Sequence, residues 1–262
     1  MSSWYKVTYG NGKFVAVAGS GTNRVMYSTD AINWTSASAA EQNAWYDVTY
    51  GNGKFVAVSS NGTNRVMYSS DAITWTSASA AEANNWYGVT YGGGKFVATS
   101  SNGTNRVMYS TDGITWTAAS AAEQNQWESV TYGEVTPPPT TWQLASATQA
   151  NTWDGVIYGD GKWVAVAQDG ANRVMYSTDG GLTWTAASGT EDNNWRDIAY
   201  APEHNIPPTT WTAASAAEQN EWKSVTYGDG KFVAVSSTGT NRVMYSSDGI
   251  TWTSASAAEQ NG

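Results

Sequence analysis

One segment of about 41 residues occurs five times along the chain with few changes. The second copy, from Trp45 to Asn85, reads WYDVTYGNGKFVAVSSNGTNRVMYSSDAITWTSASAAEANN. Two further copies, beginning at Trp127 and Trp195, keep the start and the end of this segment but lack its middle. A fixed period of this size predicts a repeat architecture, because so short a unit cannot bury its apolar face alone.

The composition of the 262-residue chain excludes several classes of protein. With 40% hydrophobic and 13% charged residues it is typical of a folded chain. A net charge of −9 argues against binding to nucleic acid or to an anionic membrane surface. The absence of cysteine excludes disulfides and cysteine-based zinc sites. No apolar run is long enough to span a membrane, and the chain starts directly in the repeat, so no secretory signal is expected.

Each full copy contains four segments typical of β-strands. In the second copy these are WYDVTYG, KFVAVS, NRVMYS and TWTSAS, which are rich in aromatic and β-branched residues. The first two are joined by Asn52-Gly53, a dipeptide that favours a tight hairpin turn. Four antiparallel strands per repeat predict an all-β fold, a β-propeller with the first strand of each blade innermost. A solenoid or a row of small sandwiches is the main alternative.

The connection between the third and fourth strands carries a recognisable motif. Ser177, Asp179, Gly181, Thr183 and Trp184 form a pattern that resembles the Asp-box of sialidases and other propellers with BNR repeats. The other four full copies are one residue shorter here, and the whole repeat is similar to tandem propeller repeats of bacterial and phage proteins. The resemblance implies a propeller fold, but not sialidase activity. It also implies a structural role for the repeated aspartates, on the face opposite an active site. These are Asp30, Asp71, Asp112, Asp179 and Asp248.

The two short copies decide the expected number of blades. Both replace the second and third strands by a Pro-rich link, which cannot itself be a central strand. We predict one domain over 1–262, with seven angular positions, five full blades and two reduced blades; a five- or six-bladed ring is the alternative. The chain is either a closed ring or a piece of a longer array, arising by recent duplication or by consensus design. The predicted full blades are at about 4–44, 45–85, 86–126, 153–194 and 222–262, and the reduced ones at about 127–152 and 195–221.

The copies differ mainly around the first Trp of each copy and in the loop between strands two and three. Because strand direction alternates, these variable positions are expected on one face, opposite the Asp-containing turns. A constant scaffold with a varied polar rim is typical of a recognition surface, although neutral drift at exposed sites is the alternative. The candidate ligand-binding residues are Trp4, Tyr5, Lys6, Trp45, Tyr46, Asp47, Trp86, Tyr87, Trp127, Glu128, Trp153, Asp154, Trp195, Arg196, Asp197, Trp222, Lys223, Asn61, Asn102 and Asp169.

The arginines that precede the third strand are predicted to pair with nearby carboxylates rather than to form an anion-binding ring. Exposed pairs of this kind contribute only about 0–1 kcal/mol each, so their expected role is positional. The single His204 lies in a Pro-rich link and supports neither catalysis nor metal binding. No catalytic residue, metal ligand or cofactor is predicted. The arginines are Arg24, Arg65, Arg106, Arg173 and Arg242, and the carboxylates are Glu41, Glu82, Glu123, Glu218 and Glu259.

These patterns favour a non-enzymatic propeller that binds a carbohydrate or a cell-surface polymer. Trp and Tyr rings stack on sugars, polar side chains bond hydroxyl groups, and repeated weak sites gain avidity. A lectin-like phage or bacterial surface protein, associated with a virion or a cell surface, fits this interpretation. A structural or protein-binding scaffold, with a protein partner or a second copy of the chain, is the alternative. A glycosidase would require two carboxylates at catalytic separation.

Overall fold

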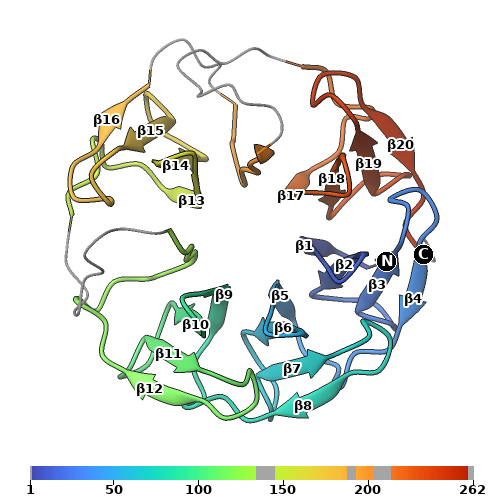
Figure 1. Cartoon of the computed structure of the whole chain (residues 1–262), viewed down its shortest axis with the longest axis horizontal. Coiled ribbons are helices and arrows are strands. Elements are labelled where there is room, and N and C mark those ends of the chain that lie inside the picture. The colour runs from blue at the N-terminus through green and yellow to red at the C-terminus, as the bar shows by residue number, and fades with distance from the viewer. Residues whose placement is uncertain (1, 134–144, 188–192, 203–213, 259–262) are drawn as a thin grey trace.

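The computed structural model describes residues 2–133, 145–187, 193–202 and 214–258. Within these ranges the chain forms five sheets of four antiparallel strands, and in each sheet the strands lie side by side in chain order. Figure 1 shows the sheets standing around a common axis, with the first strand of each innermost and the fourth at the rim. This is the propeller arrangement predicted from the repeat, and each sheet is one blade.

The strands follow the repeat closely, with a seven-residue inner strand in every blade. Blade 1 contains β1 (Trp4–Gly10), β2 (Lys13–Ala18), β3 (Val25–Ser28) and β4 (Thr35–Ala37). Blade 2 contains β5 (Trp45–Gly51), β6 (Lys54–Ser59), β7 (Val66–Ser69) and β8 (Thr76–Ala78). Blade 3 contains β9 (Trp86–Gly92), β10 (Lys95–Ser100), β11 (Val107–Ser110) and β12 (Thr117–Ala119). Blade 4 contains β13 (Trp153–Gly159), β14 (Lys162–Ala167), β15 (Val174–Ser177) and β16 (Thr185–Ala186). Blade 5 contains β17 (Trp222–Gly228), β18 (Lys231–Ser236), β19 (Val243–Ser246) and β20 (Thr253–Ala255).

Two local features shape each inner strand. At its end, the predicted hairpin turn is present: Asn11 and Gly12 have φ values of 47° and 70°, as a type I′ turn requires. At its start, the ladder with the second strand contains a β-bulge, in blade 1 between Trp4 and Lys6. The same irregularity occurs in the other four blades. A bulge leaves one residue outside the ladder and redirects its side chain, and in blade 1 that residue is Tyr5.

The core lies between the blades rather than inside any one of them. Val15 and Val17 of β2 pack in one cluster with Trp45, Phe55 and Met67 of blade 2. The second strand of a blade is therefore covered on both faces, which explains its continuous apolar sequence. Burial of each such side chain stabilises the fold by roughly 1.5–3 kcal/mol, so neighbouring blades depend on each other.

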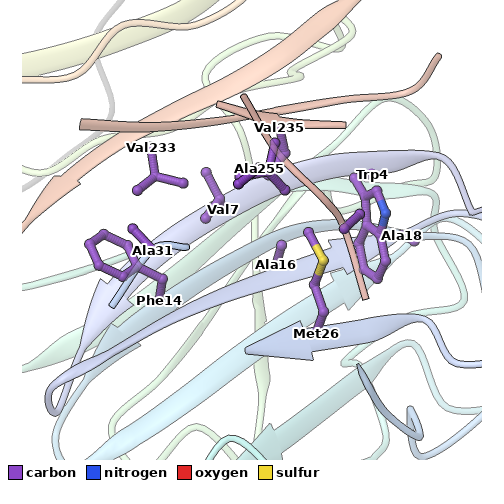
Figure 2. Packing of buried hydrophobic residues seen from close by; sticks show 12 residues of the cluster. Trp4, Val7, Phe14, Ala16, Ala18, Met26, Ala31, Val233, Val235 and Ala255 are labelled. Atoms are coloured by element: carbon purple, nitrogen blue, oxygen red, sulfur yellow. The ribbon is translucent and has the colours of Figure 1, made fainter. Parts of the chain in front are cut away.

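Blade 5 packs against blade 1 without sharing a strand. Val233, Val235 and Ala255 of blade 5 lie against Trp4 and Val7 of β1 in one buried cluster, as Figure 2 shows. The Arg242 guanidinium also donates a hydrogen bond to the Ser2 carbonyl oxygen. Blades 5 and 1 thus meet through the same kind of apolar contact that joins blade 1 to blade 2 and blade 2 to blade 3.

The prediction of seven positions with two reduced blades is wrong. The described residues form five blades, which was the alternative, and the short copies form no strand in residues 127–133 or 193–201. The physical reason is that these copies lack strands two and three, so their first segment has no ladder to join. The Pro-rich links largely fall in 134–144 and 203–213, outside the described residues, as do His204 and Glu259.

The two strandless inner segments, 127–133 and 193–201, nevertheless pack against the neighbouring inner strands. A Cβ atom added to Gly92 of β9 would lie only 1.9 Å from the Tyr132 ring. A Cβ atom added to Gly159 of β13 would lie 2.5 Å from the Tyr200 ring. Their resemblance to an inner strand therefore reflects a shared packing position, not a shared sheet.

Candidate ligand-binding face

The two faces of the propeller differ in what they present. One face carries the hairpin turns and the Asp-containing turns. The opposite face carries the bulged starts of the inner strands and the loops between strands two and three, where the variable residues lie. The candidate functional side chains are therefore those variable residues that are accessible to a ligand and that the fold does not require.

The Asp-containing turns are held by their own backbone. The Asp71 Oδ1 atom accepts hydrogen bonds of 2.8 Å from the backbone N–H groups of both Ile73 and Thr74, and the Ser69 hydroxyl donates to the same oxygen at 2.9 Å. The Trp75 indole closes the turn by donating to the Ala72 carbonyl oxygen. The hydrogen bonds to the Asp71 carboxylate lower its pKa to about 2, and those from the Thr74 and Ile73 N–H groups contribute most. The aspartates that accept bonds in this way are Asp30, Asp71, Asp112, Asp179 and Asp248.

Three of the seven candidate tryptophans are packing residues and not ligand platforms. Trp4, Trp45 and Trp86 have no exposed surface, because each packs against the preceding blade. The Trp45 indole N–H also donates to the backbone of its own chain, to the Glu41 carbonyl oxygen at 3.1 Å. A ligand cannot reach these three rings in the folded protein. The remaining tryptophans of the set, which are partly buried, are Trp127, Trp153, Trp195 and Trp222.

The variable loop residues serve the fold. The Asn61 side-chain oxygen accepts a 2.7 Å hydrogen bond from the Ala44 backbone N–H, and Asn102 does the same for Asn85. Asp169 takes the equivalent place in blade 4, where its carboxylate accepts from the Thr152 N–H at 2.6 Å. Each variant retains an oxygen acceptor, so the sequence variation here preserves one structural hydrogen bond. This explains the variation without a ligand.

The variable residues two positions after the inner Trp tie neighbouring inner strands together. The buried Asp47 carboxylate accepts from the Val48 N–H at 2.7 Å and from the Val89 N–H of the next blade at 2.8 Å. Burial is the main reason that the pKa of Asp47 rises to about 6, although Lys6 and the two N–H groups oppose this rise. The carboxylate is therefore a link between β5 and β9.

Asp197 plays a comparable role in a strandless inner segment. It accepts from the Lys6 ammonium group and the Ser224 hydroxyl, both at 2.8 Å, and from the Val225 N–H at 3.2 Å. The Ser224 hydroxyl oxygen in turn accepts from the Val7 N–H. These bonds connect residues 193–201, blade 5 and blade 1 around the axis. Asp47, Asp197 and Lys6 thus have structural partners that a sequence comparison among copies does not reveal.

Glycine occupies this position where a strandless segment follows. A Cβ atom on Gly88 of β9 would lie 3.0 Å from the Glu128 carbonyl oxygen, and one on Gly155 of β13 would lie 3.0 Å from the Asp197 Cα atom. Both glycines permit the close approach of the next inner segment. The side chain found two residues after the inner Trp therefore depends on how closely the next inner segment approaches it.

What remains of the variable face is the residue directly after each inner Trp. We call this set the bulge ring, since five of its members are the bulged residues and two hold the same position in the strandless segments. Their side chains are partly or fully exposed, and none is buried. The bulge ring consists of Tyr5, Tyr46, Tyr87, Glu128, Asp154, Arg196 and Lys223.

Three of the seven members of the bulge ring are aromatic. Tyr5 and Tyr46 stack with ring centroids 4.8 Å apart and an interplanar angle of 14°, and Tyr46 meets Tyr87 edge-on at 4.6 Å. These three consecutive rings, which we call the aromatic arc, come from β1, β5 and β9. Burial, together with the nearby Tyr46 and Glu221 side chains, raises the pKa of Tyr5. The Tyr5 phenol is therefore neutral at physiological pH and combines an apolar ring with a polar edge.

The other four members of the bulge ring are charged. Arg196 and Asp154 form a 3.0 Å ion pair, and Lys223 pairs with Glu221 at 3.4 Å. Burial raises the pKa of Asp154, with further contributions from Glu128, while Arg196 opposes the rise. Glu221 directly precedes an inner Trp and was not among the candidate ligand-binding residues. Its contact with Lys223 depends on the path of the chain through the β-bulge, which the sequence does not show.

Among the described residues, no ion pair joins Arg24, Arg65 or Arg106 to a glutamate, contrary to the prediction. Arg24 donates to the Gln42 carbonyl oxygen at 2.8 Å, and Arg65 donates to the Asn84 carbonyl oxygen at 2.8 Å. The Glu41 carboxylate instead accepts from the side chain and the backbone N–H of Asn64. The arginines still join successive repeats, but through backbone carbonyl groups.

The described residues contain no cluster of three or more His, Cys, Asp or Glu side chains that could hold a metal ion. In the same part of the chain, no helix has the length and hydrophobicity that a membrane crossing requires. The bulge ring is therefore best described by its rings and ion pairs.

Comparison with known proteins supports the architecture. Virginiamycin B lyase from Staphylococcus aureus, in a catalytically inactive form with quinupristin, is similar over 97% of this chain and 84% of its own, with a TM-score of 0.63 and 11% identity. Saccharomyces cerevisiae Sqt1 is similar over 94% of this chain and 83% of its own, with a TM-score of 0.57 and 11% identity. The chain is a β-propeller. No family model and no curated protein sequence matches it, and identities this low carry the fold alone.

Proposed function

We propose that this propeller is a non-enzymatic binding protein that recognises a carbohydrate or a surface polymer at the bulge ring. The observation that carries the proposal is the aromatic arc, in which Tyr46 packs against both Tyr5 and Tyr87 at positions where the copies of the repeat diverge. The part of these rings that remains exposed offers apolar surface and a hydroxyl edge to a sugar, while the adjacent charged side chains supply donors and acceptors for hydroxyl groups. The arc requires no cofactor.

Two further features support a binding role over catalysis. Asp47 accepts hydrogen bonds from two backbone N–H groups, and Asp197 accepts from the Val225 N–H and pairs with Lys6, so both inner carboxylates have structural partners. The turn of Asp179 has the sequence pattern of an Asp-box, and in it Ser177 and Asp179 accept hydrogen bonds from the Gly181 and Thr183 N–H groups. We infer kinship with Asp-box propellers of the tandem type, and a setting on a phage particle or a bacterial surface.

A glycan array followed by calorimetry on the strongest hit tests this function. Tyr46→Ala removes the central ring of the aromatic arc, and we expect affinity to fall at least about tenfold, or ~1.4 kcal/mol. Tyr109→Ala is the matched control, because Tyr109 is a 38% exposed tyrosine on β11, outside the bulge ring. Absence of any glycan binding, or equal losses in both variants, would rule the proposal out.

A protein-binding scaffold is the second candidate, favoured by the strandless segments. Tyr132 and Tyr200 are 43% and 37% exposed, whereas the corresponding Tyr50 packs against Phe55 of the second strand at 4.8 Å. Exposed aromatic rings of this kind are enriched where proteins meet. A propeller that binds no glycan but retains a partner lost in a Tyr132→Ser, Tyr200→Ser variant would favour this alternative.

A further inference from the structure

The charges around the bulge ring are unevenly distributed. On and beside it lie three cationic side chains and five carboxylates, so the region is acidic overall. Each cation already has a carboxylate partner: Lys6 with Asp197 at 2.8 Å, Arg196 with Asp154 at 3.0 Å and Lys223 with Glu221 at 3.4 Å. An anionic ligand would have to compete with these pairs. The two further carboxylates belong to Asp47 and Glu128.

These two carboxylates have different surroundings. Asp47 is buried and uses both oxygens on backbone N–H groups. Glu128 is exposed, in the strandless segment that packs directly against Gly88 of β9, beside the aromatic arc. Its negative charge acts on both the aromatic and the charged members of the bulge ring. After burial and the neighbouring Tyr87, it contributes to the raised pKa of Tyr46, and it also contributes to that of Asp154.

An exposed carboxylate next to electron-rich aromatic faces is a favourable environment for an ammonium group. The negative face of an aromatic ring attracts a cation by about 0.5–2 kcal/mol, and a carboxylate adds a Coulombic attraction that the ring lacks. We propose that the bulge ring selects an amine-bearing sugar, such as a glucosamine polymer, with the ammonium group beside Glu128 and the sugar rings on the aromatic arc. This inference rests on the proposed function and narrows its ligand class.

The test compares two oligosaccharides that differ at the nitrogen of each sugar, which is a cationic ammonium group in one and a neutral acetamide in the other. A fully deacetylated glucosamine hexamer and its N-acetylated counterpart share the same backbone and the same stacking faces. Titration calorimetry at low salt, at a pH where the amines are protonated, should give about tenfold tighter binding of the deacetylated form, equivalent to ~1.4 kcal/mol. Added salt should reduce this preference, because it screens exposed charges.

Two variants separate a specific contact from general attraction to an acidic protein. Glu128→Gln should abolish the preference, because the affinity for the deacetylated hexamer should fall to that for the N-acetylated hexamer. Asp229→Asn is the matched control: it removes an exposed carboxylate from the hairpin turn on the opposite face, where the φ of 47° suits asparagine. It should leave the preference unchanged.

The outcomes distinguish this inference from the proposed function. Equal affinity for the two hexamers, or a preference that survives Glu128→Gln, overturns the selection of an amine. If Tyr46→Ala then still abolishes binding of both hexamers, the carbohydrate-binding function stands without it. If neither hexamer and no arrayed glycan binds at the bulge ring, both proposals fail together.

Discussion

The inner tryptophans of blades 1 to 3 and those of blades 4 and 5 occupy the same place in the repeat but differ in burial. Trp4, Trp45 and Trp86 have no exposed surface, whereas Trp153 and Trp222 are partly exposed. The difference follows from what precedes each blade along the ring. The first three follow a complete blade, and the other two follow a strandless segment.

The contacts explain this dependence. Trp45 lies in one cluster with Val15, Val17 and Val25 of the preceding blade. Residues 127–133 and 193–201 bring no second or third strand, so they cannot supply an equivalent surface. The same Trp of the repeat thus contributes differently to stability in two parts of one ring, because its burial depends on the neighbouring segment and not on the repeat itself.

The largest predicted effect tests that difference directly. Trp45→Ala should destabilise the protein by roughly 3–5 kcal/mol, since it leaves a large cavity between two complete blades. Trp222→Ala should cost clearly less, because part of that ring is already exposed. Urea unfolding of the two variants measures the difference. Equal losses would show that the two regions are equivalent in energy.

The second prediction concerns Asp47, in the tightly packed region. Its folded-state pKa of about 6 lies above its ordinary value of 3.8. Its contribution to stability is therefore complete below about pH 4 and is lost as the pH rises through 6, by roughly 3 kcal/mol. Asp47→Asn should flatten the fall in unfolding free energy between pH 4 and 6. An unchanged slope in this variant would contradict the assignment.

Asp71 on the opposite face gives the matched comparison. Its pKa is lowered to about 2 by the N–H groups of its turn, led by that of Thr74. Its contribution is therefore present above about pH 4 and is lost as the pH falls through 2. Asp71→Asn should change the acid limb of the stability curve and leave the interval from pH 4 to 6 as in the wild type.

A smaller effect on stability is expected where blade 3 meets the strandless segment 127–133. Gly88→Ala would place a methyl group 3.0 Å from the Glu128 carbonyl oxygen and 2.9 Å from the Thr99 hydroxyl oxygen. The strandless segment must move, at a cost of about 1–3 kcal/mol. In Gly53→Asn, by contrast, the new side chain meets open space at a φ of 73° that asparagine tolerates. Denaturant midpoints that shift equally in both variants would argue against a close contact at Gly88.

The smallest effect concerns the charged members of the bulge ring. Lys223→Gln should change stability by less than about 1 kcal/mol, because its partner Glu221 is 66% exposed. Lys6→Gln should cost more, roughly 1–3 kcal/mol, since it leaves the largely buried Asp197 without its cation. Thermal unfolding at low salt compares the two. A larger loss for Lys223→Gln would reverse the expected order.

Local features of the fold could be predicted from the sequence. The Asn11-Gly12 turn and the strand composition specify the hairpin and the four-stranded blade, because both depend on neighbouring residues. The blade count could not be predicted, since the motif from Trp127 to Gly133 matches an inner strand while its ladder partners are missing. Whether a strand forms depends on those absent partners.

The candidate site was only partly predictable, for a similar reason. Variation at Asn61, Asn102 and Asp169 resembles the variation of a binding surface, but each residue keeps one acceptor for a backbone N–H. Burial of Trp45 by another blade is equally invisible in a single repeat. The tyrosines of the aromatic arc were among the candidates, but their mutual stacking required the geometry of the bulges.

The central claim is that the aromatic arc is the ligand-binding surface. The most direct test is carbon-13 NMR of protein labelled at its 15 tyrosines, titrated with the two glucosamine hexamers and assigned by single Tyr→Phe variants. We predict shifts that saturate with ligand and are confined to Tyr5, Tyr46 and Tyr87. Shifts at Tyr109, Tyr132 or Tyr200 without changes in the arc, or no shifts at all, would contradict the claim.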